Sequence, residues 1–270
     1  MITSLSVKDF KAVPYLETSQ LIANNPTVKF THNKPNVIVG PNGAGKSALL
    51  KALSFYTLSN YLGVSCLDDN YIVGRDADAL WANIGSAWRE EFVYLHGLAI
   101  VGDRAPAMYY RPNHIPGNER MIAAAMMMGY CEEAKAYGEL TKRKSDGQKS
   151  LAVQARIMEF LQNPVIDGYQ RVNWHYRGVD SHKSDNTSKA QVLTNLYRDC
   201  SGTPMLLMDE PEQSLDTLAE VRLWKTIENA DCSKLQIIVA SHSMYPVLYN
   251  GRFNLIEAMP GYIDSVLASF

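Results

Sequence analysis

A glycine-rich segment at residues 40–47 constrains the fold of this chain more than any other feature. It reads GPNGAGKS, fits the pattern G-x-x-x-x-G-K-[ST], and directly follows the apolar run NVIV at residues 36–39. The next residues, ALLKALSFYTL, have the apolar spacing of a helix. A strand, a glycine loop and a helix in this order predict a cradle in which backbone N–H groups and a helix N-terminus bind phosphate. The candidate ligands are Gly40, Pro41, Asn42, Gly43, Ala44, Gly45, Lys46 and Ser47.

Two further apolar runs end in polar residues. MLLM at residues 205–208 is followed by Asp209 and Glu210, and LQIIVA at 235–240 is followed closely by His242. Short, mainly apolar runs of this kind are typical of buried parallel strands. Because the carboxyl ends of parallel strands meet at one edge of a sheet, we expect these side chains to lie near the glycine loop.

The residue types at these positions indicate ATP and Mg²⁺ as ligands. In such a site Lys46 reaches the β- and γ-phosphates, while Ser47 and Asp209 hold Mg²⁺. Glu210 is then the candidate general base that polarises the attacking water. The alternative for the loop is a surface turn that contains Gly and Lys, and the alternative for the acids is a strand that ends in two solvated carboxylates.

The pattern along the chain predicts an α/β fold of the P-loop NTPase type. Buried strands alternate with helices, which favours a mainly parallel central sheet with flanking helices. We also expect an antiparallel β part at the N-terminus. The predicted strands span residues 2–7, 27–30, 36–39, 205–208, 235–240 and 253–256, and further helices span 145–162 and 217–230.

A single domain over residues 1–270 accommodates these elements together with two insertions. The first, at 48–143, is expected to form a lateral subdomain, and the second, at 163–204, is expected to carry specificity. With 46% hydrophobic and 20% charged residues, the chain has the composition of a folded protein. We find no heptad run that would form a coiled-coil arm.

Charge and cysteine usage exclude several classes of protein. The net charge of −2 gives no global positive field for nucleic acid or anionic lipid, so such binding would need a local patch. The four cysteines are widely spaced without a C-x-x-C pair, which fits a reducing compartment and disfavours a thiolate zinc site. We expect a cytoplasmic protein with no membrane partner, because no secretory signal or membrane span is evident.

Together, GPNGAGKS, MLLMDEPEQSLD and VASHS resemble the motifs of ATP-binding cassette (ABC) ATPases in order and spacing. The resemblance implies that Glu210 is the catalytic glutamate and that residues 214–216, with Asp216, form the D-loop. It also implies that His242 is the switch histidine that senses the γ-phosphate.

The signature loop of the same family has a candidate at residues 144–148, KSDGQ. Ser145 and Gly147 supply a hydroxyl and a backbone N–H at a helix N-terminus, and Gln148 completes the motif. In ABC ATPases this loop grips the γ-phosphate bound by the partner subunit, so the resemblance implies a head-to-tail homodimer around two ATP molecules. Asp146 departs from the transporter motif and resembles the signatures of the SMC, RecF and OLD-like branch.

Two other features favour that non-transporter branch. No Gln occurs between Ser47 and Ser145, so the usual Q-loop residue is missing, and the connection from Gln148 to residue 205 is long. Without a coiled coil or room for a nuclease domain, the chain resembles a stand-alone ATPase head. Rival interpretations are a transporter ATPase subunit and a regulatory module that binds a nuclease or toxin under the control of ATP.

The segment at residues 168–189 is the candidate nucleic-acid contact. It combines Arg171 and Arg177 with Trp174 and Tyr176, and basic residues interleaved with aromatic ones suit phosphate contact and base stacking. The alternative is a polar loop that packs its aromatic side chains onto the head. We therefore expect a target that is nucleic acid or a phage- or defence-related complex, with a protein partner as the other option.

Overall fold

The fold is described from a computed structural model. The structure describes residues 1–11, 13, 16–56, 60–61, 64–65, 97–103, 105, 107–112, 143–164 and 202–269. Most of the two predicted insertions, at 48–143 and 163–204, lies outside these residues, and so does the basic and aromatic segment at 168–189. The domain layout and that nucleic-acid contact therefore stay predictions.

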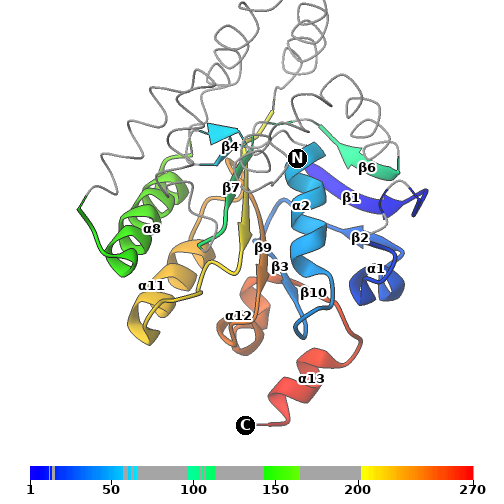
Figure 1. Cartoon of the computed structure of the whole chain (residues 1–270). Coiled ribbons are helices and arrows are strands. Elements are labelled where there is room, and N and C mark those ends of the chain that lie inside the picture. Colours follow the sequence, from blue (N-terminus) through cyan, green and yellow to red (C-terminus); the bar gives the residue numbers. More distant parts are fainter. Residues whose placement is uncertain are drawn as a thin grey trace, which may run out of the picture.

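The central sheet confirms the predicted α/β fold. Its strand order is β10-β3-β9-β8-β7-β4-β5, and the five strands from β10 to β7 are parallel (Figure 1). β3, β8 and β9 are buried at every residue, as expected of central parallel strands. The strands are β3 (Asn36–Val39), β4 (Asn60–Tyr61), β5 (Val64–Ser65), β7 (Ala107–Tyr110), β8 (Met205–Asp209), β9 (Gln236–Ser241) and β10 (Asn254–Glu257).

A second sheet confirms the antiparallel N-terminal β part. It has the order β2-β1-β6 and consists of β1 (Ile2–Val7), β2 (Thr27–Lys29) and β6 (Leu98–Gly102). The buried Gln236 side chain joins it to β9, accepting from Ile2 N at 2.7 Å and donating to Ile2 O at 2.6 Å. This pair of hydrogen bonds satisfies a buried amide and fixes the two sheets to each other.

Helices cover both sides of the central sheet (Figure 1). The pair α8 (Asp146–Gln162) and α11 (Thr217–Glu228) packs together on one side, and α2 (Lys46–Tyr56) contacts β8 and β9 from the other. α2 begins two residues before the predicted helix, because the glycine loop passes directly into its first turn. The shorter helices are α1 (Gln20–Asn24), α12 (Tyr245–Leu248), the 3-10 turn η2 (Asn250–Arg252) and α13 (Tyr262–Leu267).

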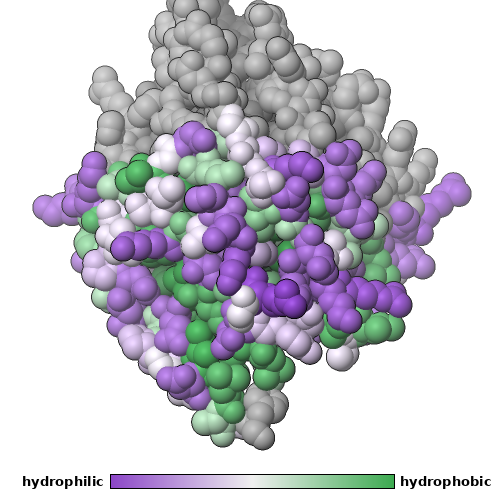
Figure 2. All heavy atoms as spheres, turned by 180° about the vertical axis from the view of Figure 1, so that it is seen from behind, coloured by the Kyte–Doolittle hydropathy of each residue, from purple (hydrophilic) through white to green (hydrophobic). Residues whose placement is uncertain are grey.

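The surface around the C-terminal helices is partly apolar. Figure 2 shows hydrophobic side chains gathered in the lower part of the molecule, where α12 and α13 lie in Figure 1. Leu248, Met259 and Leu267 are among the exposed hydrophobic residues of this region. Among the described residues, no helix is long and apolar enough to span a bilayer.

Candidate active site

The register of the central sheet brings the predicted site residues to one edge. Val39 is paired with Ser241, and Asp209 with Ala240, so the three strands end at almost the same level. The glycine loop leaves β3 at this edge, and Glu210 and His242 follow β8 and β9. The pairing of the strands therefore places these three segments at one edge of the sheet.

The glycine loop is shaped by a close neighbour. Gly45 has φ +95°, and a Cβ atom there would collide with the Ser19 hydroxyl. Ser19 caps α1 and donates to Ala44 O at 3.2 Å, while Leu21 N donates to the same oxygen at 2.9 Å. Glycine at position 45 is therefore required both by the backbone conformation and by the packing of α1 against the loop.

Lys46 lies beneath the loop with its ammonium group facing the strand ends. The side chain is only 4% exposed, and Nζ donates to Gly40 O at 2.8 Å and Pro41 O at 2.9 Å. Nζ also lies 3.0 Å from His242 Nε2. Burial lowers the pKa of Lys46, and the charge of Glu210 opposes this shift. An anion at the loop would supply the counter-charge that neutral carbonyl groups do not.

Ser47 and Asp209 form the candidate cation site. The Ser47 hydroxyl donates to Asp209 Oδ1 at 2.8 Å, and the Asp209 side chain is 1% exposed. Burial raises the pKa of Asp209, while the Ser47 hydrogen bond and the Arg111 charge lower it. A hydroxyl and one carboxylate are hard oxygen donors that fit Mg²⁺, which takes its remaining ligands from phosphate and water.

The other oxygen of Asp209 has two partners that the sequence motifs did not indicate. Tyr109 OH donates to Asp209 Oδ2 at 3.3 Å, and Arg111 Nε lies 3.4 Å from the same atom. Both residues come from β7 or its end, next to β8 in the sheet. Neither residue lies in one of the sequence motifs, because their contact with Asp209 depends on which strand lies beside β8.

Glu210 and His242 face each other at the exposed side of the site. His242 Nε2 lies 3.2 Å from Glu210 Oε1, and burial followed by the Lys46 charge lowers the pKa of His242. Glu210 has φ +51°, a left-handed conformation that costs a non-glycine residue about 1 kcal/mol. Its backbone N–H donates to Ala240 O at 2.8 Å, which holds this conformation and aims the carboxylate at the edge of the sheet.

Glu212 is a buried carboxylate that holds the segment around His242. Its Oε1 accepts from Ser241 Oγ at 2.7 Å, His242 N at 2.8 Å and Ser243 N at 3.1 Å. Its Oε2 has no hydrogen-bond partner among the described residues, and burial raises the pKa of the carboxyl group. No local sequence pattern indicates this role, because the contact joins the ends of two different strands.

The predicted signature and D-loop residues stand at helix N-termini. Ser145 caps α8 in a capping box with Gln148, both are exposed, and Gly147 lies in the first turn. Asp216 caps α11, with Oδ1 accepting from Leu218 N and Ala219 N at 2.9 Å each. Within the described part of the chain, no hydrogen bond joins Ser145, Gln148 or Asp216 to the glycine loop.

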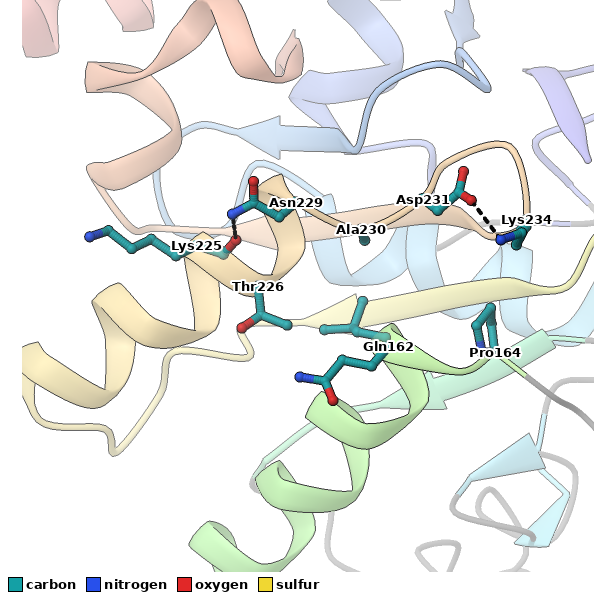
Figure 3. A pocket seen from close by; sticks show the side chains of 9 residues that line it. Gln162, Pro164, Lys225, Thr226, Asn229, Ala230, Asp231 and Lys234 are labelled. Carbon is teal, nitrogen blue, oxygen red and sulfur yellow. Dashed lines mark hydrogen bonds and ion pairs between the residues drawn. The ribbon is translucent and has the colours of Figure 1, made fainter.

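A separate pocket of about 420 Å³ lies at the opposite edge of the sheet (Figure 3). It is formed by the ends of α8 and α11 and the turn before β9, where Asp231 pairs with Lys234 at 3.1 Å. Because α11 runs away from the strand ends that hold Asp209, this pocket is not part of the candidate active site.

A comparison with known protein families supports the assignment of the site to a P-loop ATPase. Residues 167–247 match the family model described as "AAA domain, putative AbiEii toxin, Type IV TA system". No curated protein matches the chain. The matched region contains Asp209, Glu210 and His242 but not the glycine loop, so the two signals are independent. The fold, the loop and the family match together indicate a P-loop ATPase.

Proposed function

We propose that this protein binds Mg·ATP and hydrolyses it as an ABC-type ATPase of the SMC, RecF and OLD-like branch. The observation that carries the proposal is the cluster at the strand ends. Ser47 contacts Asp209 at 2.8 Å, and His242 Nε2 lies within 3.2 Å of both Lys46 and Glu210. Cation ligands, a phosphate-binding ammonium and a candidate base thus meet beside one glycine loop.

Each residue of the candidate site has a defined task in this proposal. The loop N–H groups and Lys46 bind the phosphates, and Lys46 exchanges the Gly40 and Pro41 carbonyls for phosphate oxygens. Ser47 and Asp209 would hold Mg²⁺, which neutralises charge on the β- and γ-phosphates when bound. Glu210 accepts a proton from the attacking water, and the neutral His242 can donate a hydrogen bond to the γ-phosphate.

The proposal includes a head-to-tail homodimer. Ser145, Gly147 and Gln148 lie at an exposed helix N-terminus, where backbone N–H groups and the helix dipole favour an anion. In the dimer this N-terminus would contact the γ-phosphate bound by the partner subunit, with Asp216 nearby in the D-loop. The closed dimer would act as a clamp on a nucleic acid or a defence-related complex.

Phosphate release from ATP tests the ATPase proposal. Wild-type protein with Mg²⁺ should release phosphate, and Glu210→Gln should reduce the rate roughly 100-fold or more while ATP binding is kept. Glu159→Gln, on the exposed face of α8, is the matched control and should keep the wild-type rate. Wild-type rates in Glu210→Gln would contradict the assignment of the base.

A regulatory binding module is the second candidate function. The matched family description names a toxin of a toxin–antitoxin system, which favours a role in which ATP switches binding to a protein partner. In that case the dimer should hold ATP with negligible turnover even in the wild type. A turnover that rises with dimer formation would favour the ATPase clamp instead.

A further inference from the structure

Arg111 is a cation beside the carboxylate that the proposed function assigns to Mg²⁺. It directly follows β7, which pairs in parallel with β8, so Arg111 lies at the same sheet edge as Asp209. Arg111 Nε lies 3.4 Å from Asp209 Oδ2, and the Ser47 hydroxyl donates to Oδ1 at 2.8 Å. Arg111 and Ser47, the last residue of the glycine loop, therefore each contact one oxygen of the buried Asp209 carboxylate.

This arrangement suits the site when no nucleotide is bound. The Asp209 side chain is 1% exposed, and a buried carboxylate needs a counter-charge, which Arg111 supplies. A divalent ion held by Ser47 and Asp209 would take over that task and repel the neighbouring guanidinium. The Arg111 side chain is 43% exposed, so it has room to adopt another rotamer.

We propose that Arg111 exchanges partners when Mg·ATP binds, leaving Asp209 and pairing with the γ-phosphate. This inference rests on the proposed function. Ser47 and Asp209 would hold the cation that neutralises the terminal phosphates, so the γ-phosphate is the anion that would lie near Asp209. The planar guanidinium matches phosphate oxygens in a bidentate contact, and it stabilises the charge of a transferring phosphoryl group. Arg111 thereby makes the site prefer ATP over ADP.

A purely structural role for Arg111 makes a different prediction. If the side chain only neutralises Asp209, its loss disturbs the cation site for any nucleotide, and the affinities for ATP and ADP fall together. If it contacts the γ-phosphate, its loss weakens ATP alone, because ADP has no such group. The ratio of the two affinities separates these roles independently of the rate of hydrolysis.

The test is calorimetric titration of the whole chain with ADP and with a non-hydrolysable ATP analogue, both with Mg²⁺. Arg111→Ala should bind the ATP analogue roughly 10- to 100-fold more weakly, with a change below about threefold for ADP. Arg111→Gln, of similar length but neutral, should behave in the same way, whereas Arg111→Lys should keep part of the preference.

Arg252→Ala is the matched control for these variants. Arg252 Nε lies 3.4 Å from Glu228 Oε1, which is the same pair geometry as that of Arg111, but η2 is outside the active site. This variant should keep both affinities. An equal loss for both nucleotides in the Arg111 variants, or no loss, would overturn the inference. Failure of the wild type to bind either nucleotide would instead overturn the proposed function itself.

Discussion

The phosphate loop and the 144–148 segment are the two halves of the proposed site, and they are held in different ways. Around the loop, Lys46 and Asp209 are 4% and 1% exposed, and their polar atoms contact groups from three neighbouring strand ends. In the other segment Ser145 and Gln148 are exposed, and they bond to each other as a capping box. The loop half is thus assembled from several elements of one chain. The 144–148 half is a capped helix N-terminus that is exposed to solvent.

The free energy of nucleotide binding should therefore come mainly from the loop half. The loop half is assembled within one chain and should bind ATP in a monomer, since Lys46 only has to exchange loop carbonyls for phosphate oxygens. The 144–148 half should matter only once a second copy brings it to the phosphate. Variants in the two halves should therefore separate binding from dimer formation.

The largest effect is expected in the loop half, from Lys46→Ala. Removing the buried ammonium should weaken ATP binding roughly 100-fold, because charge-assisted contacts to two phosphates are lost. Titration of the monomer with ATP measures this loss. Lys34→Ala is the control, since Lys34 Nζ also donates to a carbonyl, that of Gly251 at 2.8 Å, but far from the loop. A comparable loss in both variants would show that the loop half is not the binding half.

Glu212→Ala should loosen the strand ends around His242 while the glycine loop stays intact. Ser241 Oγ and His242 N would lose their acceptor and Ser243 N would keep only the Ser241 hydroxyl, so the free energy of unfolding should fall by about 2 kcal/mol or more. Glu212→Gln keeps a carbonyl oxygen for these donors and removes a buried charge, so it should stay close to wild type. Chemical denaturation of both variants measures the difference. Equal destabilisation would mean that the charge, and not the hydrogen bonds, holds the segment.

The smallest effect on stability is expected in the 144–148 half. Ser145→Ala removes the cap of α8 and should cost about 1 kcal/mol, whereas Ser145→Asn keeps a good cap but lacks the hydroxyl. If the hydroxyl contacts the partner's phosphate, both variants should lose about tenfold in the ATP turnover of the dimer. Wild-type turnover in Ser145→Asn would show that Ser145 acts only as a helix cap.

Local patterns in the sequence predicted the core of the fold and the loop half of the site. The short, mainly apolar runs around residues 36–39, 205–208 and 235–240 are typical of buried strands, and polar residues follow each run at the candidate site. Arg111 and Glu212 were missed as site residues for a physical reason. Their roles depend on which strand lies beside which, and β7 meets β8 across about 100 residues of sequence.

In the proposed mechanism, ATP joins the two halves of the site across a dimer. The most direct test is the mass in solution of Glu210→Gln with and without Mg·ATP, a variant in which binding is kept and hydrolysis is blocked. We predict a monomer without nucleotide and a stable dimer with Mg·ATP, which Lys46→Ala should abolish. The dimer should then be tested for binding of single- and double-stranded DNA, to separate a nucleic-acid clamp from a protein partner. A Glu210→Gln protein that binds ATP and stays monomeric would contradict the account.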